Sequence, residues 1–538
     1  MILKRAIFTS LAMATMASSP ALAVFIDGHG SYALRGETRT KPGFNQETGV
    51  YQAVDQFFQL DTEIRTSDKA SFFLEFRLFD QDRESNLGDD TQLDTCPTPI
   101  GAGEDYNCAE QSGLQQDAIE PRYKDLQPRV TKAYAQYAMD YCLLTVGRRD
   151  RHWGLGLYLD GGNDVFDTDA SIYDGVTCDI NLQKSQTLGF SVGYDKISET
   201  GGSIYATGIA DQNYGPNNRS DDLDQIFFTI EYNDHKTNAG KGFSQQVGIY
   251  FANIFGGGNT GTDIKVADLY LNFIISDLVI QNEILFRLGE SADPNLALLG
   301  GARRLNDTDE FKNNVQSIAA AGSIEYFLSR SGSVLGPAKF KQGTATSHSL
   351  FFDYAFAPGD PDGYLPEYES LSDPESARDR SVKAVAFHRN FKPGLLLFNG
   401  TTGIDDKRVD GIFDPYRVMN ASVFSLGYRY KSLVNGNFEI KFVTASLNES
   451  ISSDAKSFYQ SGDDELTQAE RDNKERPIGF YGDSLGMELD VSYSKSLGEG
   501  LELGVAGAIA QGGDAWKVKD SQSAQDNYLL QGHISFQF

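Results

Sequence analysis

The sequence has few basic residues, few cysteines and no long apolar segment. Its 538 residues include 47 lysines and arginines against 75 aspartates and glutamates, which gives a net charge of −28. A nucleic-acid-binding protein needs a basic surface to displace phosphate counterions, so this shortage of base argues against one. Beyond the N-terminus no run of about 18 apolar residues occurs, which excludes a helical membrane protein.

The apolar and aromatic residues narrow the choice of fold further. They make up 40% and 12% of the chain, which is too much for a disordered protein. Two classes remain. One is a large soluble β-rich protein, and the other is a transmembrane β-barrel, whose membrane signal is hidden in residue alternation.

The N-terminus has the three parts of a secretory signal peptide. Lys4 and Arg5 form a charged region, residues 6–19 form a short apolar core, and Ala21-Leu22-Ala23 matches a cleavage site. The alternative is a buried N-terminal helix. We expect residues 1–23 to be removed on export across a bacterial inner membrane, and residues 24–538 to form a single domain.

Apolar and polar residues alternate along the whole chain. In 56–65 one face carries Phe58, Leu60 and Ile64, while the other carries charged residues; a turn at 66–69 and a second alternating run follow. Such alternation also suits one strand of a soluble sandwich. Its repetition in runs of about ten residues, without a helical pattern between them, favours membrane-spanning strands.

The links between these runs alternate in length. Short links lie at 66–70, 140–143, 276–277, 432–437 and 496–500, and long polar links lie at 82–127, 289–314, 358–380, 449–483 and 511–527. The sequence therefore predicts an all-β fold, a transmembrane antiparallel β-barrel of about 18 strands, within a range of roughly 16 to 20. Short turns would face the periplasm and long acidic loops the cell exterior. The stretch 149–182 gives the least secure strand count.

The four cysteines are disulfide candidates, because export leads to an oxidising compartment. Cys96 and Cys108 lie in one polar stretch, and Cys142 and Cys178 lie further on. We expect Cys96–Cys108 first and Cys142–Cys178 second, although three pairings are open. A zinc site is less favoured, because no C-x2-C spacing occurs.

The last strand ends in an aromatic residue at the C-terminus. Counting back from Phe538, every second residue is apolar or small, including Phe536, Ile534, Leu530 and Tyr528. This resembles the C-terminal β-signal of Gram-negative outer-membrane proteins, which the barrel-assembly machinery reads. The resemblance implies an integral protein of the outer membrane, in contact with lipid and lipopolysaccharide.

A second segment, 146–157, reads V-G-R-R-D-R-H-W-G-L-G-L. It resembles a segment of large outer-membrane porins and of alginate-export-type barrels.

A passive channel for ions and small hydrophilic solutes is the first hypothesis, because the predicted inner face carries mixed charge. A polysaccharide exporter is the second. A structural or adhesive barrel that displays disulfide-stapled acidic loops is the third. The protein would be a monomer or a homotrimer.

The inner face of the predicted barrel supplies the candidate pore-lining residues, which are the charged residues opposite the apolar positions. They are Arg35, Asp61, Glu63, Arg65, Glu75, Arg77, Lys132, Arg149, Arg151, Glu231, Glu283, Arg287, Arg429 and Lys441. Opposed charges would set a transverse field in the pore. The alternative is that they are ordinary cross-strand pairs that hold the wall. Arg148, Arg149 and Arg151 with His152 form the densest basic cluster. If Arg149 and Arg151 point inward, they could form one wall of a constriction. The alternative is a strand end where the arginines pair with neighbouring acids.

Other chemistry has little support in the sequence. Asp160, Asn163, Asp164, Asp167 and Asp169 lie close enough to suggest a Ca²⁺ loop, but no calcium-loop motif is present and solvated loops are favoured. We therefore expect no cofactor and no metal. None of the six histidines lies in a metalloprotease motif, and no G-x-S-x-G elbow occurs, so an enzyme is not expected.

Overall fold

The structure is a computed structural model of the chain. It describes residues 25–40, 44, 51–78, 129–162, 164, 166–167, 170–181, 187–198, 223–235, 242–256, 262–291, 313–331, 346–360, 381–388, 390–399, 417–451, 456, 460, 467, 476, 478–498, 500–517, 519–520 and 523–538. The predicted signal peptide lies outside these residues.

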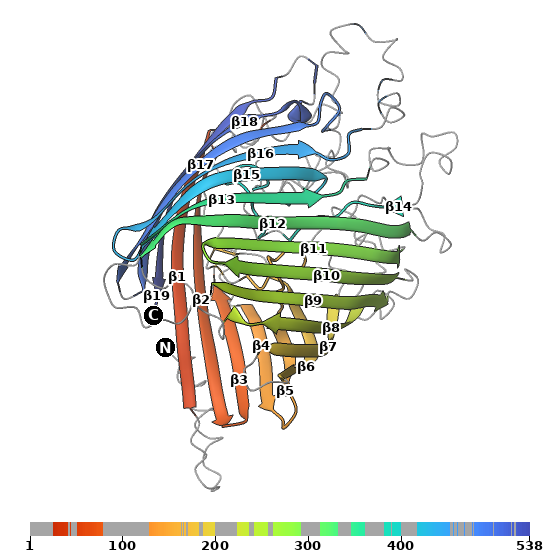
Figure 1. Ribbon diagram of the computed structural model, residues 1–538, viewed down its shortest axis with the longest axis vertical. Helices are drawn as coiled ribbons and strands as arrows, with labels where there is room; N and C mark the ends of the chain where they lie inside the picture. The colour runs from red at the N-terminus through yellow and green to blue at the C-terminus, as the bar shows by residue number, and fades with distance from the viewer. Residues whose placement is uncertain are drawn as a thin grey trace, which may run out of the picture.

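One sheet curves round to close on itself (Figure 1). Its strands are β1 (Phe25–Arg39), β2 (Tyr51–Ser67), β3 (Ala70–Leu78), β4 (Arg129–Ala138), β5 (Leu143–Asp150), β6 (Ile172–Asn181), β7 (Leu188–Ser198), β8 (Leu223–Asn233), β9 (Phe243–Gly256), β10 (Thr262–Ile275), β11 (Leu278–Ser291), β12 (Asn313–Ser331), β13 (Thr346–Ala357), β14 (Ser381–Val382), β15 (Ala421–Ser432), β16 (Gly436–Leu447), β17 (Ser484–Gly498), β18 (Leu501–Gly512) and β19 (Asp526–Gln537). A 3₁₀ helix, η7 (Asp514–Trp516), follows β18.

Eighteen of these strands form the ring, each antiparallel to its neighbours in chain order. The pairing of β1 with β19, in which Arg35 lies opposite His533, closes it. The two-residue β14 stands apart and pairs in parallel with the start of β12. The predicted all-β fold and its strand number are therefore confirmed. Closure also leaves no unpaired edge, so the ring satisfies the backbone polar groups of every strand.

The two faces of the sheet differ in chemistry. On β8, Ile226, Phe228 and Ile230 are exposed, whereas Gln225 and Phe227, on the opposite face, are buried. The strand registers continue this assignment round the ring, so exposed apolar side chains cover the outer face of most strands. The apolar positions of the sequence pattern are thus the outer face, and the charged positions are the inner face.

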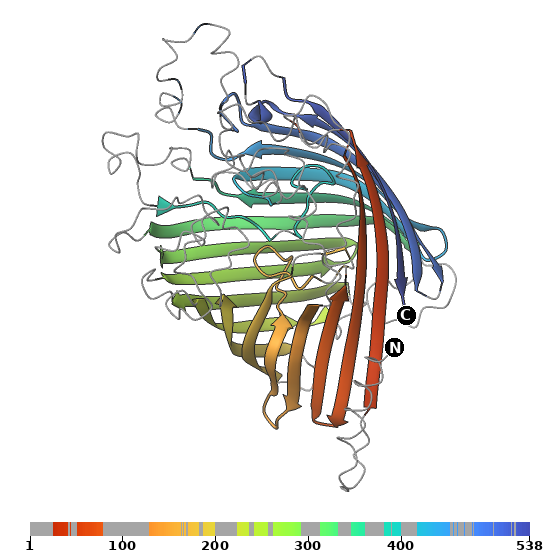
Figure 2. The same cartoon turned by 180° about the vertical axis from the view of Figure 1, so that it is seen from behind.

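The links fall at the two ends of the barrel as predicted. Residues 68–69, 139–142, 276–277 and 433–435 form tight connections at one end, which we call the short-turn end. The predicted long links lie between strands at the other end, the long-loop end. The start of β1 and the C-terminus lie at the short-turn end (Figure 2). The uncertain stretch 149–182 consists of the end of β5, a loop and β6. Which end faces the periplasm stays a prediction.

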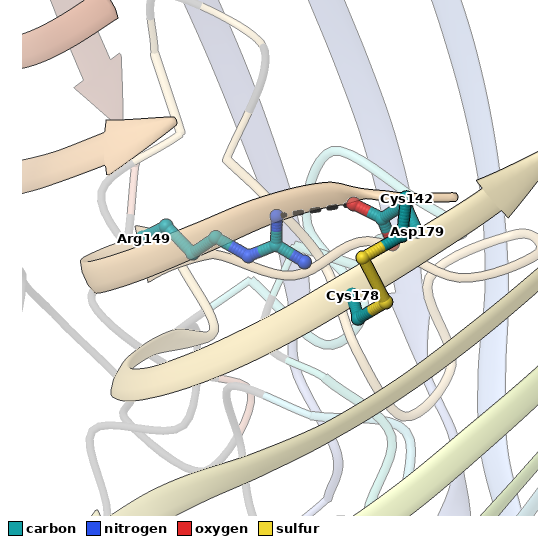
Figure 3. The surroundings of a disulfide bond; sticks show 4 residues. All are labelled: Cys142, Arg149, Cys178 and Asp179. Atoms are coloured by element: carbon teal, nitrogen blue, oxygen red, sulfur yellow. Dashed lines mark ion pairs between the residues drawn. A yellow bond between two sulfur atoms is a disulfide. The ribbon is translucent and has the colours of Figure 1, made fainter. Parts of the chain in front are cut away.

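The disulfide between Cys142 and Cys178 joins the β4–β5 turn to β6, with 5.5 Å between the two Cα atoms (Figure 3). The second expected pairing is therefore confirmed. Cys96 and Cys108 lie outside the described residues. No helix among the residues that the structure describes is long and apolar enough to cross a membrane.

The C-terminal strand β19 presents the predicted assembly signal on its outer face. Tyr528, Leu530, Ile534, Phe536 and Phe538 are all exposed there. Phe538 also exchanges two backbone hydrogen bonds of 2.9 Å with Gly30 of β1, so the last residue takes part in closing the ring. Recognition of this strand by the assembly machinery stays a prediction.

Candidate functional site in the barrel interior

The loop that follows β5, residues 151–171, lies inside the barrel (Figure 2). It begins at Arg151, whose guanidinium donates to Asp195 of β7 at 2.9 Å through Nε and to Thr177 of β6 at 2.7 Å. The same group stacks on the ring of Phe227 at 4.2 Å. Asp195 is completely buried and also accepts from Gln225 at 3.1 Å. Arg151 therefore fastens the start of the loop to the wall.

A wall glutamate holds the next part of the loop. Glu283 of β11 is completely buried, and its carboxylate accepts from the backbone N–H groups of Leu155 and, at 3.2 Å, Leu157. Gly154 and Gly156 have φ of +59° and +83°, which favours glycine. A Cβ on Gly154 would also collide with the Glu283 carboxylate. The glycines of the W-G-L-G-L segment thus form a cradle for one carboxylate.

The far part of the loop reaches the opposite wall. The Phe166 ring packs edge-on against Phe57 of β2 at 5.4 Å and against His533 of β19 at 5.2 Å. Arg77 of β3 donates to the carbonyl of Asp167 at 3.3 Å. In the ring order, β1–β3 lie half a turn from β11. The loop therefore crosses the lumen from one side to the other, and we call residues 151–171 the crossbar.

A second inward loop, residues 383–399, is held in the same way. Glu488 of β17 is buried and accepts from the backbone N–H groups of Leu396 at 2.7 Å and Leu397 at 2.8 Å. A Cβ on Gly394 would collide with this carboxylate. Arg39 of β1 donates to the carbonyl of Asn399 at 3.1 Å. We call this segment the second loop.

The crossbar and the second loop contact each other. His388 donates its backbone N–H to the carbonyl of Leu157 at 2.8 Å, and Asn390 donates to Asp160 at 3.1 Å. Apolar side chains of both loops pack together against small and apolar inner-wall residues. This block includes Leu157, Leu159, Phe387, Leu396 and Leu397 from the loops and Ala252, Ile264, Leu285, Val423 and Ala508 from the wall. The two loops therefore narrow the lumen as one packed unit.

The structure places the predicted pore-lining residues on the inner face, with Arg151 in the crossbar. Arg35, Glu75, Arg77, Arg151, Glu283 and Arg287 are buried; Asp61, Glu63, Lys132, Arg149, Glu231, Arg429 and Lys441 are half-buried; and Arg65 is exposed. Whether any of them contacts a solute stays a prediction.

Many of these residues form the cross-strand pairs that were the alternative interpretation. Arg35 bonds to Asp55 at 2.8 Å, Lys132 to Glu75 at 2.9 Å, and Lys441 to Asp490 at 3.5 Å. Arg429 lies between Glu439 at 2.7 Å and Glu325 at 3.4 Å. These bases are therefore engaged with the wall.

The three arginines that formed the basic cluster of the sequence point in different directions. Arg148 pairs with Asp174 at 2.6 Å, and both are about half exposed on the outer face. Arg149 faces inward and lies 3.8 Å from Asp179, beside the disulfide (Figure 3). Arg151 is fastened to Asp195. Alternation along the strand puts Arg148 on the opposite face from Arg149. Arg149 and Arg151 both lie on the inner side, each beside an acid of the wall, and their part in a constriction stays a prediction.

The acidic part of the crossbar is held by turns of its own backbone. Asp160 accepts from the N–H of Gly162 at 2.7 Å, and Asp164 accepts from that of Phe166 at 2.9 Å. No group of carboxylates and histidines able to hold a metal ion occurs among the described residues. Asn163 and Asp169 lie outside them.

We expect Asp167 to make the stability of the crossbar depend on pH. Burial raises the pKa of Asp167 to about 6. The nearby carboxylates of Asp164 and Asp160 also raise this pKa, whereas the positive charge of Lys392 lowers it. Because this pKa lies above the value of 3.8 for a free aspartate, its contribution to stability is fully present below pH 4 and is lost as the pH rises through 6. We expect the thermal unfolding midpoint to rise between pH 7 and pH 5 in the wild type, and by less in Asp167→Asn. Equal pH dependence in both proteins would contradict this assignment.

Several residues of the interior were missed by sequence reasoning. Asp195, Gln225 and Tyr250 continue the network of Arg151, with the Tyr250 hydroxyl donating to Gln225 at 3.3 Å. Nothing local marks them, because their partners lie on other strands. The one available signal was the pair of glycines in W-G-L-G, which indicates a backbone that another group approaches closely.

Comparisons with known proteins found similarity to solved structures alone. No family model matches the chain, and no curated protein matches it. Crystal structures similar over nearly the whole length include OccK8 (OprE) of Pseudomonas aeruginosa, with 12% identity, 95% of this chain and 98% of that chain covered, and a TM-score of 0.44. OccAB4 of Acinetobacter baumannii shows 10% identity, coverage of 96% and 100%, and a TM-score of 0.42. The outer membrane protein OprD of Pseudomonas aeruginosa shows 10%, 95% and 93%, and 0.43.

Proposed function

We propose that the protein is an outer-membrane channel through which ions and small hydrophilic solutes diffuse passively. The observation that carries the proposal is the closed ring with an apolar outer face and a charged inner face. In lipid every backbone polar group must be satisfied within the protein, and a closed ring does this. An exposed apolar surface of this extent is unfavourable in water and favourable against lipid chains.

The two inward loops limit what passes. The crossbar reaches both sides of the lumen, and the second loop packs against it. A pore narrowed in this way suits small solutes better than an extended polysaccharide chain. These features favour the small-solute channel over the export barrel.

A protein at this location would have lipid and protein partners. Outer-membrane lipid and lipopolysaccharide would cover the apolar outer face. The barrel-assembly machinery would recognise β19 through its exposed terminal residues. These partners are expected only if the protein lies in the outer membrane, so evidence against that location would also exclude them.

Conductance of the purified protein in planar bilayers tests the channel. We expect discrete current steps, because each inserted barrel adds one water-filled pore of fixed conductance. Folding is checked by the shift in gel mobility between heated and unheated samples. A protein that shows this shift and inserts, but gives no current steps, would refute the proposal.

A further inference from the structure

Among the side chains that the structure describes, the inner wall carries carboxylates that pair with no lysine or arginine. Arg429 shows this locally. It contacts both Glu325 and Glu439, and the charge of Asp353 also acts on it. One guanidinium thus pairs with two carboxylates and leaves the third, Asp353, outside ion-pair distance.

Three half-buried carboxylates on the inner face are satisfied by neutral donors alone. Asp61 accepts from Gln59 at 2.9 Å, and Glu231 accepts from Gln246 at 2.8 Å. Asp353 accepts from Ser323 at 2.5 Å and Ser425 at 3.3 Å. No described lysine or arginine lies within ion-pair distance of any of the three. A neutral donor satisfies a hydrogen bond but leaves the charge in place.

The bases do not offset this charge. Among the described inner-wall bases, only Arg287 and Lys431 have no carboxylate partner. Arg287 is buried, and Lys431 is one residue from the end of β15 at the short-turn rim. Every other described base on the wall is engaged with at least one acid.

Two of the three carboxylates, Asp61 and Glu231, lie toward the short-turn end. Asp61 lines a cavity of about 520 Å³ there, together with His29, Gln59 and Phe538. Glu231 lies two residues from the short-turn end of β8. Asp353 lies near the middle of β13, four residues from its long-loop end and two residues before Ala355 of the apolar block. A solute passing the loops therefore meets fixed negative charge both beside the loops and toward the short-turn end.

We infer that the lumen prefers cations, and that among organic solutes of equal size it favours those with amino or guanidino groups over carboxylates. Fixed charges of one sign in a confined pore raise the local concentration of counterions and lower that of co-ions. Asp61, Glu231 and Asp353 are the residues that set this preference. The inference rests on the proposed channel and names its solute class.

The test is the reversal potential in a KCl gradient centred near 0.1 M, where the Debye length is about 10 Å and wall charges act across the pore. The wild type should give a potassium to chloride permeability ratio above one. The triple variant Asp61→Asn, Glu231→Gln, Asp353→Asn should lower that ratio by about two-fold or more. Asp68→Asn, which removes a charge from the exposed β2–β3 turn, should leave the ratio unchanged.

The outcomes separate this inference from the channel itself. A folded, inserted wild type without current steps overturns the channel. Current steps with anion preference, or a cation preference that the triple variant retains, overturn only the inference. If the triple variant does not assemble, the three single variants are measured. Each should lower the ratio, and three unchanged ratios would overturn the assignment.

Discussion

Replacing Glu283 by alanine should raise the single-channel conductance by about two-fold or more, with increased noise in the open state. Glu283 is the wall group that binds two backbone N–H groups of the crossbar, at Leu155 and Leu157. Without it these donors lose their acceptor in a buried place, which favours undocking of the segment. Because the crossbar spans the lumen, its release widens the passage.

The matching position on the second loop should behave alike. Glu488→Ala removes the acceptor of Leu396 and Leu397, and the double variant with Glu283→Ala should conduct more than either single variant. Gln281→Ala is the control, because Gln281 lies on β11 beside Glu283 and bonds to Tyr270 of the wall. Unchanged conductance and noise in the double variant, with normal heat-dependent gel mobility, would show that the glutamates do not hold the loops in place.

The barrel itself could be predicted from sequence because its signal is local. Each strand has one lipid-type face and one polar face, so the period of two is visible in a single run such as 56–65. Strands against the apolar block are harder to recognise. On β9 the inner residues Tyr250, Ala252 and Ile254 are apolar as well, because they pack on the inward loops. Alternation is lost there for a physical reason.

The interior arrangement could not be predicted, because it depends on contacts between distant segments. Leu155 meets Glu283 across 128 positions of the chain, and Arg39 meets Asn399 across 360. The loops have no periodicity that would indicate an inward course. Alternation also divides the arginine cluster: Arg148 and Arg149 are adjacent in sequence but face opposite sides of β5. The sequence pattern predicts which face of the sheet a residue lies on, whereas most contacts between distant segments leave no mark in it.

The second large effect concerns Arg151, whose removal should lower the free energy of unfolding by about 3 kcal/mol. Arg151→Ala leaves the Asp195 carboxylate fully buried with only Gln225 as a described side-chain donor to it. A buried charge that loses its counter-charge is strongly destabilising. It also removes the stacking on Phe227. Equilibrium unfolding in urea from detergent micelles measures the change.

Two further variants identify the cause of that loss. Arg65→Ala breaks an ion pair of similar geometry, 2.6 Å from Glu63, at an exposed site where water replaces the partner, so stability should change little. The double variant Arg151→Ala, Asp195→Asn should recover about half of the lost stability, since no uncompensated charge remains buried. A double variant no more stable than Arg151→Ala would mean that the packing of the guanidinium on Phe227, and not its charge, fastens the crossbar to the wall.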